Sequence, residues 1–253
     1  MHTYLKSLHV GFQCLYRSGA LKNNPVYIYH YFTRHLICEG DYVLDIGANL
    51  GYYTTLFSGR VGKTGRVYAV EPVQPFFDTL RWATRNRDNV TLYHCALGAE
   101  NRSITLGTPG KYGYLRTGLA RVSDDTSSKD AEFSFPAEMK KASELFEDLP
   151  RLDYIKCDIE GYETIVIPEI QPLLEQFKPP IQIESWLPVA PFLQRLGYQM
   201  HQLQNGRLVP LTHGTGNQKG DRLFIHKDNT RILERLAAKH LPEGNRTFPT
   251  SSD

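Results

Sequence analysis

The sequence predicts an α/β fold in which helices cover both faces of a doubly wound, mostly parallel sheet. Short apolar runs alternate with segments that have the spacing of helices, which is the pattern of parallel strands joined by crossover helices. The first apolar run ends in a glycine-containing turn, and later runs end in acidic residues. A chain of 253 residues can bury a large core, so we expect a single domain over 1–253.

The N-terminal half supplies the first three strands. Residues 1–40 are expected to form a helical, aromatic N-terminal segment, because apolar side chains between Tyr27 and Leu36 recur three or four positions apart. Glycine and aspartate then end that pattern. We expect strands at 42–46, 66–70 and 89–95, with helices between them at 52–61 and 74–87.

An insertion separates the third strand from the fourth. Residues 98–150 contain several glycines and a polar stretch, so we expect a looped or β-rich segment that ends in a helix near Met139–Asp148. Inserted loops tend to carry specificity, which makes this segment the candidate substrate side of the protein.

The alternation then resumes and continues to the C-terminus. We expect strands at 152–157, 181–184 and 221–226, a helix at 162–177 interrupted by Pro168 and Pro172, and helices at 191–196 and 229–241. Strands at 198–203 and 207–211 should form a hairpin, because Asn205-Gly206 suits a tight type I′ turn. Residues 242–253 are expected to be a flexible tail.

Charge and composition exclude several classes of protein. The chain has 29 basic and 27 acidic residues, and a net charge of +2 argues against nucleic acid or an anionic membrane as a partner. No apolar run approaches the ~20 residues that a membrane helix needs, and the N-terminus has no signal-peptide pattern. The four cysteines lie far apart, so we expect a reduced, cytoplasmic protein without a zinc site or disulfides.

The turn after the first strand and the acid after the second strand form one candidate ligand site. The stretch from Asp45 to Gly51 contains two glycines, which allow a tight turn and a close approach of a ligand to the backbone. Glu71 follows the second strand, 20 residues after Gly51, where a carboxylate can accept both hydroxyls of a ribose. We interpret the set as an adenosine site. The competing interpretation is an ordinary strand-to-helix turn with a solvated glutamate.

The same turn distinguishes between adenosine ligands. A dinucleotide needs its pyrophosphate on a G-x-G-x-x-G turn at a helix N-terminus. Here Asn49 replaces the second close-approach glycine, and Asp45 adds a negative charge that repels phosphate. A cationic ligand with an ammonium group and a sulfonium suits these residues better, which favours S-adenosylmethionine over NAD.

Three acids follow the fourth expected strand. Asp158, Glu160 and Glu163 fall within six residues, at the sheet edge where ligands of such folds bind. Mutual repulsion should raise the pKa of at least one of them, which suits a general base for a hydroxyl substrate. Helix capping explains the same residues equally well. No fourth ligand for a divalent cation is evident, so we predict no metal.

Several of these segments resemble the FkbM-type methyltransferases. The resemblance rests on VLDIGANLGYYT at 43–54 and DYIKCDIEGYE at 153–163, and it extends over about residues 25–226. Val70-Glu71-Pro72, Asn89-Val90 and Ala96-Leu97 also match. The resemblance implies a class I methyltransferase fold, S-adenosylmethionine as the cofactor, and methyl transfer that is usually to an oxygen.

The resemblance also implies roles for individual residues. Asp45, Gly47, Asn49 and Gly51 would line the methionine end of the cofactor, Glu71 would hold the ribose, and Cys95 and Ala96 would border the adenine. Of the two tyrosines that open the first helix, Tyr53 is the candidate cofactor contact. Asp158 and Glu160 match the acidic motif and are the candidate catalytic residues. General base, partner of the cofactor ammonium and helix cap all remain open for them.

Other residues are weaker candidates. Glu184, Ser185 and Trp186 follow the fifth strand and should face the same cleft, with packing as the preferred role of Trp186. Solvated loops are the preferred explanation of Tyr112, Tyr114, Arg116, Arg121 and His213. Cys157 should be buried. The basic side of the C-terminal helix (Arg231, Arg235, Lys239) should be solvated rather than bound to membrane or nucleic acid.

The sequence therefore predicts an S-adenosylmethionine-dependent methyltransferase whose substrate is a small molecule, with a hydroxyl on a sugar or secondary metabolite as the acceptor. The alternatives are an N-methyltransferase acting on nucleic acid or protein, an NAD-dependent oxidoreductase, and a binding module without turnover. The near-neutral charge argues against nucleic acid, and Asp45 with Asn49 argues against NAD. The oligomeric state does not follow from the sequence.

Overall fold

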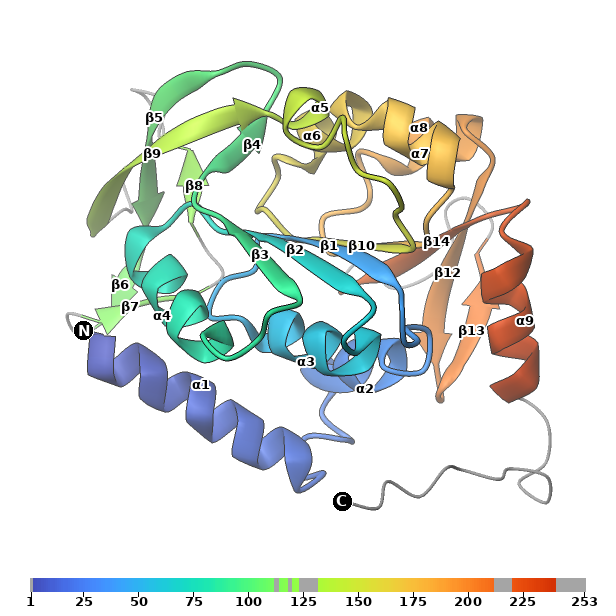
Figure 1. Ribbon diagram of the computed structural model, residues 1–253, viewed down its shortest axis with the longest axis horizontal. Helices are drawn as coiled ribbons and strands as arrows, with labels where there is room; N and C mark the ends of the chain where they lie inside the picture. The colour runs from blue at the N-terminus through green and yellow to red at the C-terminus, as the bar shows by residue number, and fades with distance from the viewer. Residues whose placement is uncertain (1, 112–113, 118–119, 123–131, 212–219, 240–253) are drawn as a thin grey trace.

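An eight-stranded sheet runs through the middle of the molecule and separates two layers of helices (Figure 1). The computed structural model describes residues 2–111, 114–117, 120–122, 132–211 and 220–239. In spatial order the strands are β3 (Val90–Tyr93), β2 (Arg66–Val70), β1 (Tyr42–Ile46), β10 (Tyr154–Cys157), β11 (Ile181–Ile183), β14 (Arg222–His226), β12 (Tyr198–Gln204) and β13 (Arg207–Pro210).

The sheet is the doubly wound, mostly parallel sheet that the sequence predicts. The strands from β3 to β11 are parallel, and the strand order reverses between β1 and β10. β14 runs antiparallel to both β11 and β12, and β13 completes the edge. The carboxyl ends of β1, β2, β10 and β11 therefore meet at one edge, next to the switch point where ligands of such sheets bind.

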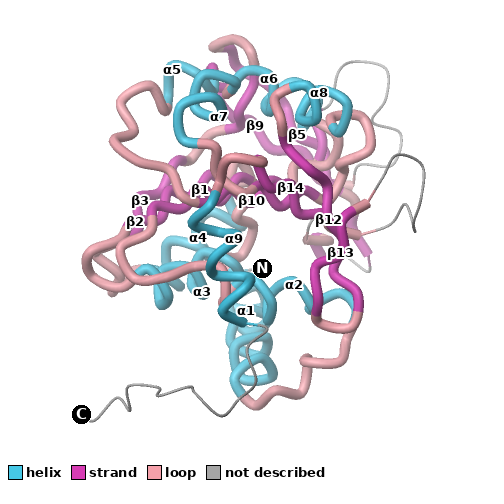
Figure 2. Tube along the Cα trace, turned by 90° about the vertical axis from the view of Figure 1, so that its right-hand side faces the viewer, coloured by secondary structure: helices cyan, strands magenta, loops and turns pink. Residues whose placement is uncertain are grey.

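Helices cover both faces of the sheet (Figure 2). One layer contains α1 (His2–Arg17), the short helix η1 (Pro25–Tyr27), α2 (Ile28–Thr33), α3 (Tyr52–Val61), α4 (Gln74–Thr84) and α9 (Thr230–Lys239); the other contains α5 (Ala142–Leu145), α6 (Glu163–Glu169), α7 (Gln171–Phe177) and α8 (Ala190–Arg195). Successive side chains of β1 point to opposite faces of the sheet, so Val43 packs toward α3 while Leu44 and Ile46 pack toward α6 and α8.

The predicted helical N-terminal segment packs on the outside of the first layer. α1 lies across α4 and α3 (Figure 1). Leu5 of α1 is buried in a cluster with Phe76, and His9 Nδ1 lies 2.8 Å from the backbone oxygen of Leu50. The N-terminal helix thereby supports the turn that follows β1. Within the described residues, no helix combines the length and the apolar character needed to cross a bilayer.

Two local predictions from turn and proline chemistry are confirmed. Asn205 and Gly206, between β12 and β13, have φ angles of 50° and 76°, as a type I′ turn requires. The helix expected over 162–177 is divided at Ile170 into α6 and α7. Pro168 lies near the end of α6, and Pro172 lies in the first turn of α7, where a missing N–H is tolerated.

The insertion forms a second sheet, and the helix expected near Met139–Asp148 is present only as the short α5 (Ala142–Leu145). The strands β4 (Ala96–Gly98), β9 (Phe133–Lys141), β5 (Arg102–Thr108) and β8 (Arg121–Val122) lie side by side in that order, and β6 (Gly110–Lys111) pairs with β7 (Tyr114–Leu115). Met139 belongs to β9, because that strand pairs with β4 on one side and β5 on the other. Pairing with two neighbours outweighs the local helix preference, and only the short α5 follows.

The basic side of α9 is ion-paired at two of its three residues. Arg231 Nη2 and Arg235 Nη1 lie 2.6 and 2.7 Å from the two oxygens of Asp41, a carboxylate that is buried at the start of β1. Arg231 also pairs with Asp153 at the start of β10. The expectation of a solvated face holds for Arg231, whose side chain is 46% exposed, and is wrong for Arg235, which is 16% exposed. The side chain of Lys239 lies outside the described part of the chain.

Candidate active site

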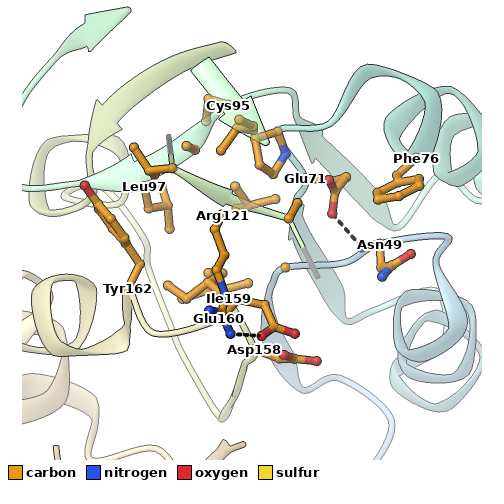
Figure 3. A pocket seen from close by; sticks show the side chains of 18 of the residues that line it. Asn49, Glu71, Phe76, Cys95, Leu97, Arg121, Asp158, Ile159, Glu160 and Tyr162 are labelled. Carbon is orange, nitrogen blue, oxygen red and sulfur yellow. Dashed lines mark hydrogen bonds and ion pairs between the residues drawn. The ribbon is translucent and has the colours of Figure 1, made fainter. Parts of the chain in front are cut away.

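A cavity of about 270 Å³ opens at the carboxyl edge of the sheet, beside the switch point (Figure 3). It lies between the turn after β1, the end of β2, the strands of the insertion and the loop after β10. The predicted site residues that line it are Gly47, Asn49, Glu71, Cys95, Ala96, Asp158 and Glu160. Asp45, Gly51 and Tyr53 do not line it. The structure thus brings most of the predicted residues together around one cavity.

The turn after β1 depends on close backbone packing. Gly47 has a φ of 77°, and a Cβ at this position would lie 1.9 Å from the backbone oxygen of Asp158. Asn49 and Gly51 also adopt left-handed φ angles, of 52° and 84°. Because the first glycine has no side chain, the loops after β1 and β10 can meet and together form one side of the cavity.

Asp45 lies beneath this turn. Its side chain is fully buried, and its Oδ2 accepts a hydrogen bond from Thr54 Oγ1 of α3 at 2.6 Å. Its Oδ1 has no hydrogen-bond partner among the described residues. Burial raises the pKa of this carboxyl, and the charge of Lys156 acts in the opposite direction. The structure supports a role of Asp45 in holding the turn on α3, and its contact with a cofactor stays a prediction.

Glu71 ends β2 with both carboxylate oxygens bound to the backbone. Oε2 accepts the N–H of Asn49, drawn in Figure 3, and Oε1 accepts the N–H of Val73, both at 2.8 Å. The side chain is buried, and this burial raises the pKa of Glu71 to about 7, although the two hydrogen bonds and Lys156 lower it. Each oxygen keeps a further lone pair, so the carboxylate can still accept ribose hydroxyls from the cavity.

The wall opposite the acids is apolar. Cys95 lies after β3, and Ala96 begins β4, which also contains Leu97. Figure 3 shows Cys95 and Leu97 on this side of the cavity, whereas Phe76 lies beside Glu71 and Asn49. Burial raises the pKa of the Cys95 thiol to about 11, so the thiol is neutral at physiological pH. Apolar side chains next to backbone polar groups suit a flat heteroaromatic ring such as adenine.

The acids after β10 take different positions. Glu163, the first residue of α6, turns into the preceding loop and accepts the N–H groups of Ile159 and Gly161. Asp158 and Glu160 instead line the cavity. Glu160 Oε2 lies 3.6 Å from Nη2 of Arg121, which reaches over the cavity from the insertion (Figure 3). The N-cap residue of α6 is Tyr162 and no side chain caps this helix, so capping does not explain Asp158 or Glu160.

Lys156 is a site residue that the sequence analysis missed. Its Nζ lies 3.1 Å from Asp158 Oδ2 and donates a hydrogen bond to the backbone oxygen of Gly47 at 3.2 Å. Burial lowers the pKa of this amine, but the charges of Asp158 and Asp45 outweigh burial and raise it. In return, Lys156 holds the pKa of Asp158 below its ordinary value despite burial. A lysine within the apolar strand YIKC was the available signal.

Glu184 faces the same acids, as its place after β11 predicts. It forms a hydrogen bond with Asp158, and one oxygen each of Asp158, Glu160 and Glu184 lie within 4.8 Å of one another. Burial and the charge of Asp158 raise the pKa of Glu184 to about 8. Lys156 and Arg121 already pair with two of these carboxylates, and the absence of a metal stays a prediction.

A buried polar row lies under the acids. Asp45, Lys156 and Gln182 are register partners on β1, β10 and β11. Gln182 Nε2 donates to the Tyr53 hydroxyl at 2.8 Å and also to Asp221, which precedes β14. The Tyr53 ring stacks on His30 with centroids 3.7 Å apart, so the structure places Tyr53 in the core.

The remaining candidates divide between the core and the undescribed segments. Trp186 is buried with the Arg222 guanidinium 4.8 Å from its ring centroid, and Cys157 is also buried, so packing is confirmed for both. Tyr112, His213 and the side chain of Tyr114 lie outside the described residues. Arg116 is exposed and does not line the cavity.

Comparison with known proteins identifies the family. The family described as "Methyltransferase FkbM domain" matches residues 45–207, which include both motifs of the cavity. The chain belongs to the FkbM methyltransferase family. The cofactor that goes with this family and with the class I methyltransferase fold is S-adenosylmethionine.

Individual proteins match the chain over parts of their length. A protein-L-isoaspartate O-methyltransferase from Methanosarcina mazei is 38% identical over 80 residues, which are 32% of this chain and 31% of that protein. The crystal structure of methyltransferase FkbM from Methylobacillus flagellatus has a TM-score of 0.50 at 15% identity, and the match covers 78% of this chain and 50% of that one. A fibrillarin from Aeropyrum pernix, solved with S-adenosyl-L-methionine, has a TM-score of 0.43 at 13% identity, covering 74% and 67%. The chain therefore spans about half of the solved FkbM relative and a third of the curated one.

Proposed function

We propose that this FkbM-family chain transfers the methyl group of S-adenosylmethionine to a hydroxyl of a small molecule, a sugar or a secondary metabolite. The observation that carries the proposal is the cavity between Glu71 and the acids Asp158 and Glu160. One end has a carboxylate that can accept ribose hydroxyls beside an apolar wall, and the other end is negatively charged. These are the features that an adenosine with a cationic sulfonium end requires.

Different residues of the cavity would bind different parts of the cofactor. When bound, S-adenosylmethionine supplies an electrophilic methyl group on a positively charged sulfur. Glu71 would accept the ribose hydroxyls, and the wall of Cys95 and Ala96 would hold the adenine. Gly47 and Asn49 would let the methionine part run along the backbone of the turn. The carboxylates of Asp158 and Glu160 would stabilise the positive end of the cofactor.

The acids also favour one class of acceptor. Asp158, Glu160 and Glu184 gather where the acceptor would meet the methyl group, and Lys156 and Arg121 are already paired with two of them. These two cations are therefore engaged by carboxylates instead of being free for the phosphates of a nucleic acid or the pyrophosphate of NAD. The same carboxylates accept hydrogen bonds, which suits a substrate with several hydroxyls.

Calorimetric titration with S-adenosylhomocysteine, and with NADH in parallel, tests the proposal. We expect S-adenosylhomocysteine to bind and NADH not to bind. Glu71→Gln should weaken the binding by about tenfold or more, because one acceptor oxygen for the ribose is lost. Glu147→Gln changes an exposed carboxyl outside the cavity and is the matched control. Binding of NADH alone would overturn the proposal. If binding is as expected, sugars and hydroxylated metabolites would be screened as methyl acceptors.

A further inference from the structure

Glu184 lies beside Asp158, which lines the cavity, and one carboxylate oxygen of each is within 4.8 Å of the other. The two residues follow the neighbouring parallel strands β11 and β10, and their carboxyl groups are hydrogen-bonded to each other. A hydrogen bond between two carboxyl groups requires that one of them carries the proton. Lys156, 3.1 Å from Asp158 Oδ2, favours the charged form of Asp158, so the proton resides on Glu184.

The other two acids are less suited to accept a further proton. Asp158 is stabilised as a carboxylate by Lys156 and by Glu184, and these contacts make it a weak base. Glu160 has Arg121 facing it at 3.6 Å. Glu184 has no ion pair with a basic residue in the described part of the chain, and its side chain is exposed, so an acceptor molecule can reach it from solvent.

We propose that Glu184 is the catalytic residue that takes the proton of the acceptor hydroxyl, with Asp158 as the positioning residue that orients it. This inference rests on the proposed function. In the transfer the acceptor oxygen forms a bond to the methyl carbon, and the carbon–sulfur bond breaks with its electron pair going to sulfur. The hydroxyl proton goes to the Glu184 carboxylate and from there to solvent.

The charges around Glu184 explain how it becomes a free carboxylate. The charged or titratable groups near the pair are Lys156 of β10, Asp45 of β1, Glu160 with its partner Arg121, Glu163 of α6, Asp221 before β14, and His30 of α2. Asp158, Asp221 and Glu160 all favour the protonated form of Glu184. A cation in the cavity acts in the opposite direction, so binding of a cationic cofactor should release the Glu184 proton.

The number of protons released when a ligand binds tests the assignment of Glu184, and this measurement needs no known methyl acceptor. Calorimetric titrations at pH 7.5, in two buffers that differ in ionisation enthalpy, give the number of protons released by S-adenosylmethionine and by its neutral-sulfur counterpart S-adenosylhomocysteine. With a pKa of about 8, Glu184 is about three-quarters protonated at this pH, so the cationic ligand should release about half a proton more than the neutral one. Glu184→Gln should remove this difference while both ligands still bind. Protonation of the ligands themselves is the same in both proteins and cancels.

Asp158→Asn gives a second variant with a distinct outcome. Removing the Asp158 charge lowers the pKa of Glu184, so the ligand-dependent difference should disappear at pH 7.5 and return at lower pH. A purely structural role of the pair does not predict that the difference in proton release moves to lower pH. This variant also keeps the test open if Glu184→Gln does not fold. Glu147→Gln serves again as the control and should leave the difference unchanged.

The outcomes separate the two proposals. If neither ligand binds to the wild-type protein, the proposed function is wrong. If both bind but Glu184→Gln and Asp158→Asn leave the proton difference unchanged, the assignment of Glu184 is wrong and the proposed function stands. Titration with MgCl₂ alone is a further arm. A heat of Mg²⁺ binding that Glu184→Gln removes would show that these carboxylates take a metal instead of a proton, and it would also overturn the assignment.

Discussion

The Glu71→Gln substitution should make the protein bind its cofactor less well and yet resist unfolding better as the pH rises. In the wild-type protein the Glu71 carboxyl is buried and accepts the backbone N–H groups of Asn49 and Val73. Its pKa is raised from 4.5 to about 7, mainly by burial. The glutamine amide has nearly the same shape, does not titrate, and offers one acceptor oxygen where the carboxylate offers two.

The magnitude follows from the raised pKa. The folded protein holds the Glu71 proton more tightly than the unfolded chain does, so the stability that this group contributes is present below pH 4.5 and is lost as the pH rises to about 7. A shift of this size corresponds to a loss on the order of 3 kcal/mol. The variant does not have this loss. It has instead a pH-independent penalty of about 1–3 kcal/mol for the backbone N–H that loses its acceptor.

Urea unfolding of the ligand-free protein and the variant at pH 5, 6, 7 and 8 measures the difference directly. We expect the variant to be less stable than the wild type at pH 5, and the difference in unfolding free energy to move by about 3 kcal/mol in its favour by pH 8. Other titrating groups affect both proteins equally and cancel. Glu147→Gln is the control for the substitution itself. A difference that stays constant from pH 5 to pH 8 would refute the argument that burial raises the pKa of Glu71 by more than its hydrogen bonds and Lys156 lower it.

Two further predictions concern the turn after β1 and the start of the sheet. Gly47→Ala should cost several kcal/mol of stability and abolish binding of S-adenosylhomocysteine, since its Cβ meets the backbone oxygen of Asp158 at 1.9 Å. Gly59→Ala in α3 meets open space and should gain about 0.5–1 kcal/mol, which denaturant unfolding of both variants would show. Asp41→Asn should lose about 3 kcal/mol, because Arg235, whose side chain is largely buried, then loses the carboxylate that pairs with it. Arg231→Gln, at a side chain that is 46% exposed, should lose less than about 1 kcal/mol; equal losses in denaturant unfolding would contradict this.

The parts of the fold that the sequence predicts are those with strong local signals. Asn205-Gly206 specifies its turn through the φ angles that only such residues adopt easily, and the buried strands of the central sheet are continuous apolar runs. β9 also has a local signal that our helix prediction overlooked, since apolar and polar side chains alternate along most of Phe133–Lys141. Its partners β4 and β5 lie at least 25 residues away along the chain, and a local pattern does not report which strands pair.

The candidate site likewise has some features that the sequence predicts and others that it does not. The glycine turn and the acids after β2 and β10 are predictable because the strand order brings their ends to one edge. Which acid does what depends on distances that the sequence does not contain. Glu163 turns away to bind the backbone N–H groups of the loop before α6, Lys156 reaches Asp158 from beneath, and Glu184 meets Asp158 from the next strand. Tyr53 opens α3 as expected, but its ring packs on His30 in the core.

The two edges of the sheet differ in how completely their carboxylates are paired: at the carboxyl edge Asp158 and Glu160 face Lys156 and Arg121, but two other acids do not. This contrast indicates which edge binds ligands. At the amino edge, Asp41 and Asp153 are both paired with arginines, so their charges are neutralised within the protein. At the carboxyl edge, Glu71 and Glu184 have raised pKa values and no ion pair with a basic residue in the described part of the chain. Uncompensated carboxyl groups lower stability, and they gather at the edge with the cavity. A cationic ligand bound there would supply the missing positive charge, so the groups that cost the ligand-free protein stability are the ones that would favour binding.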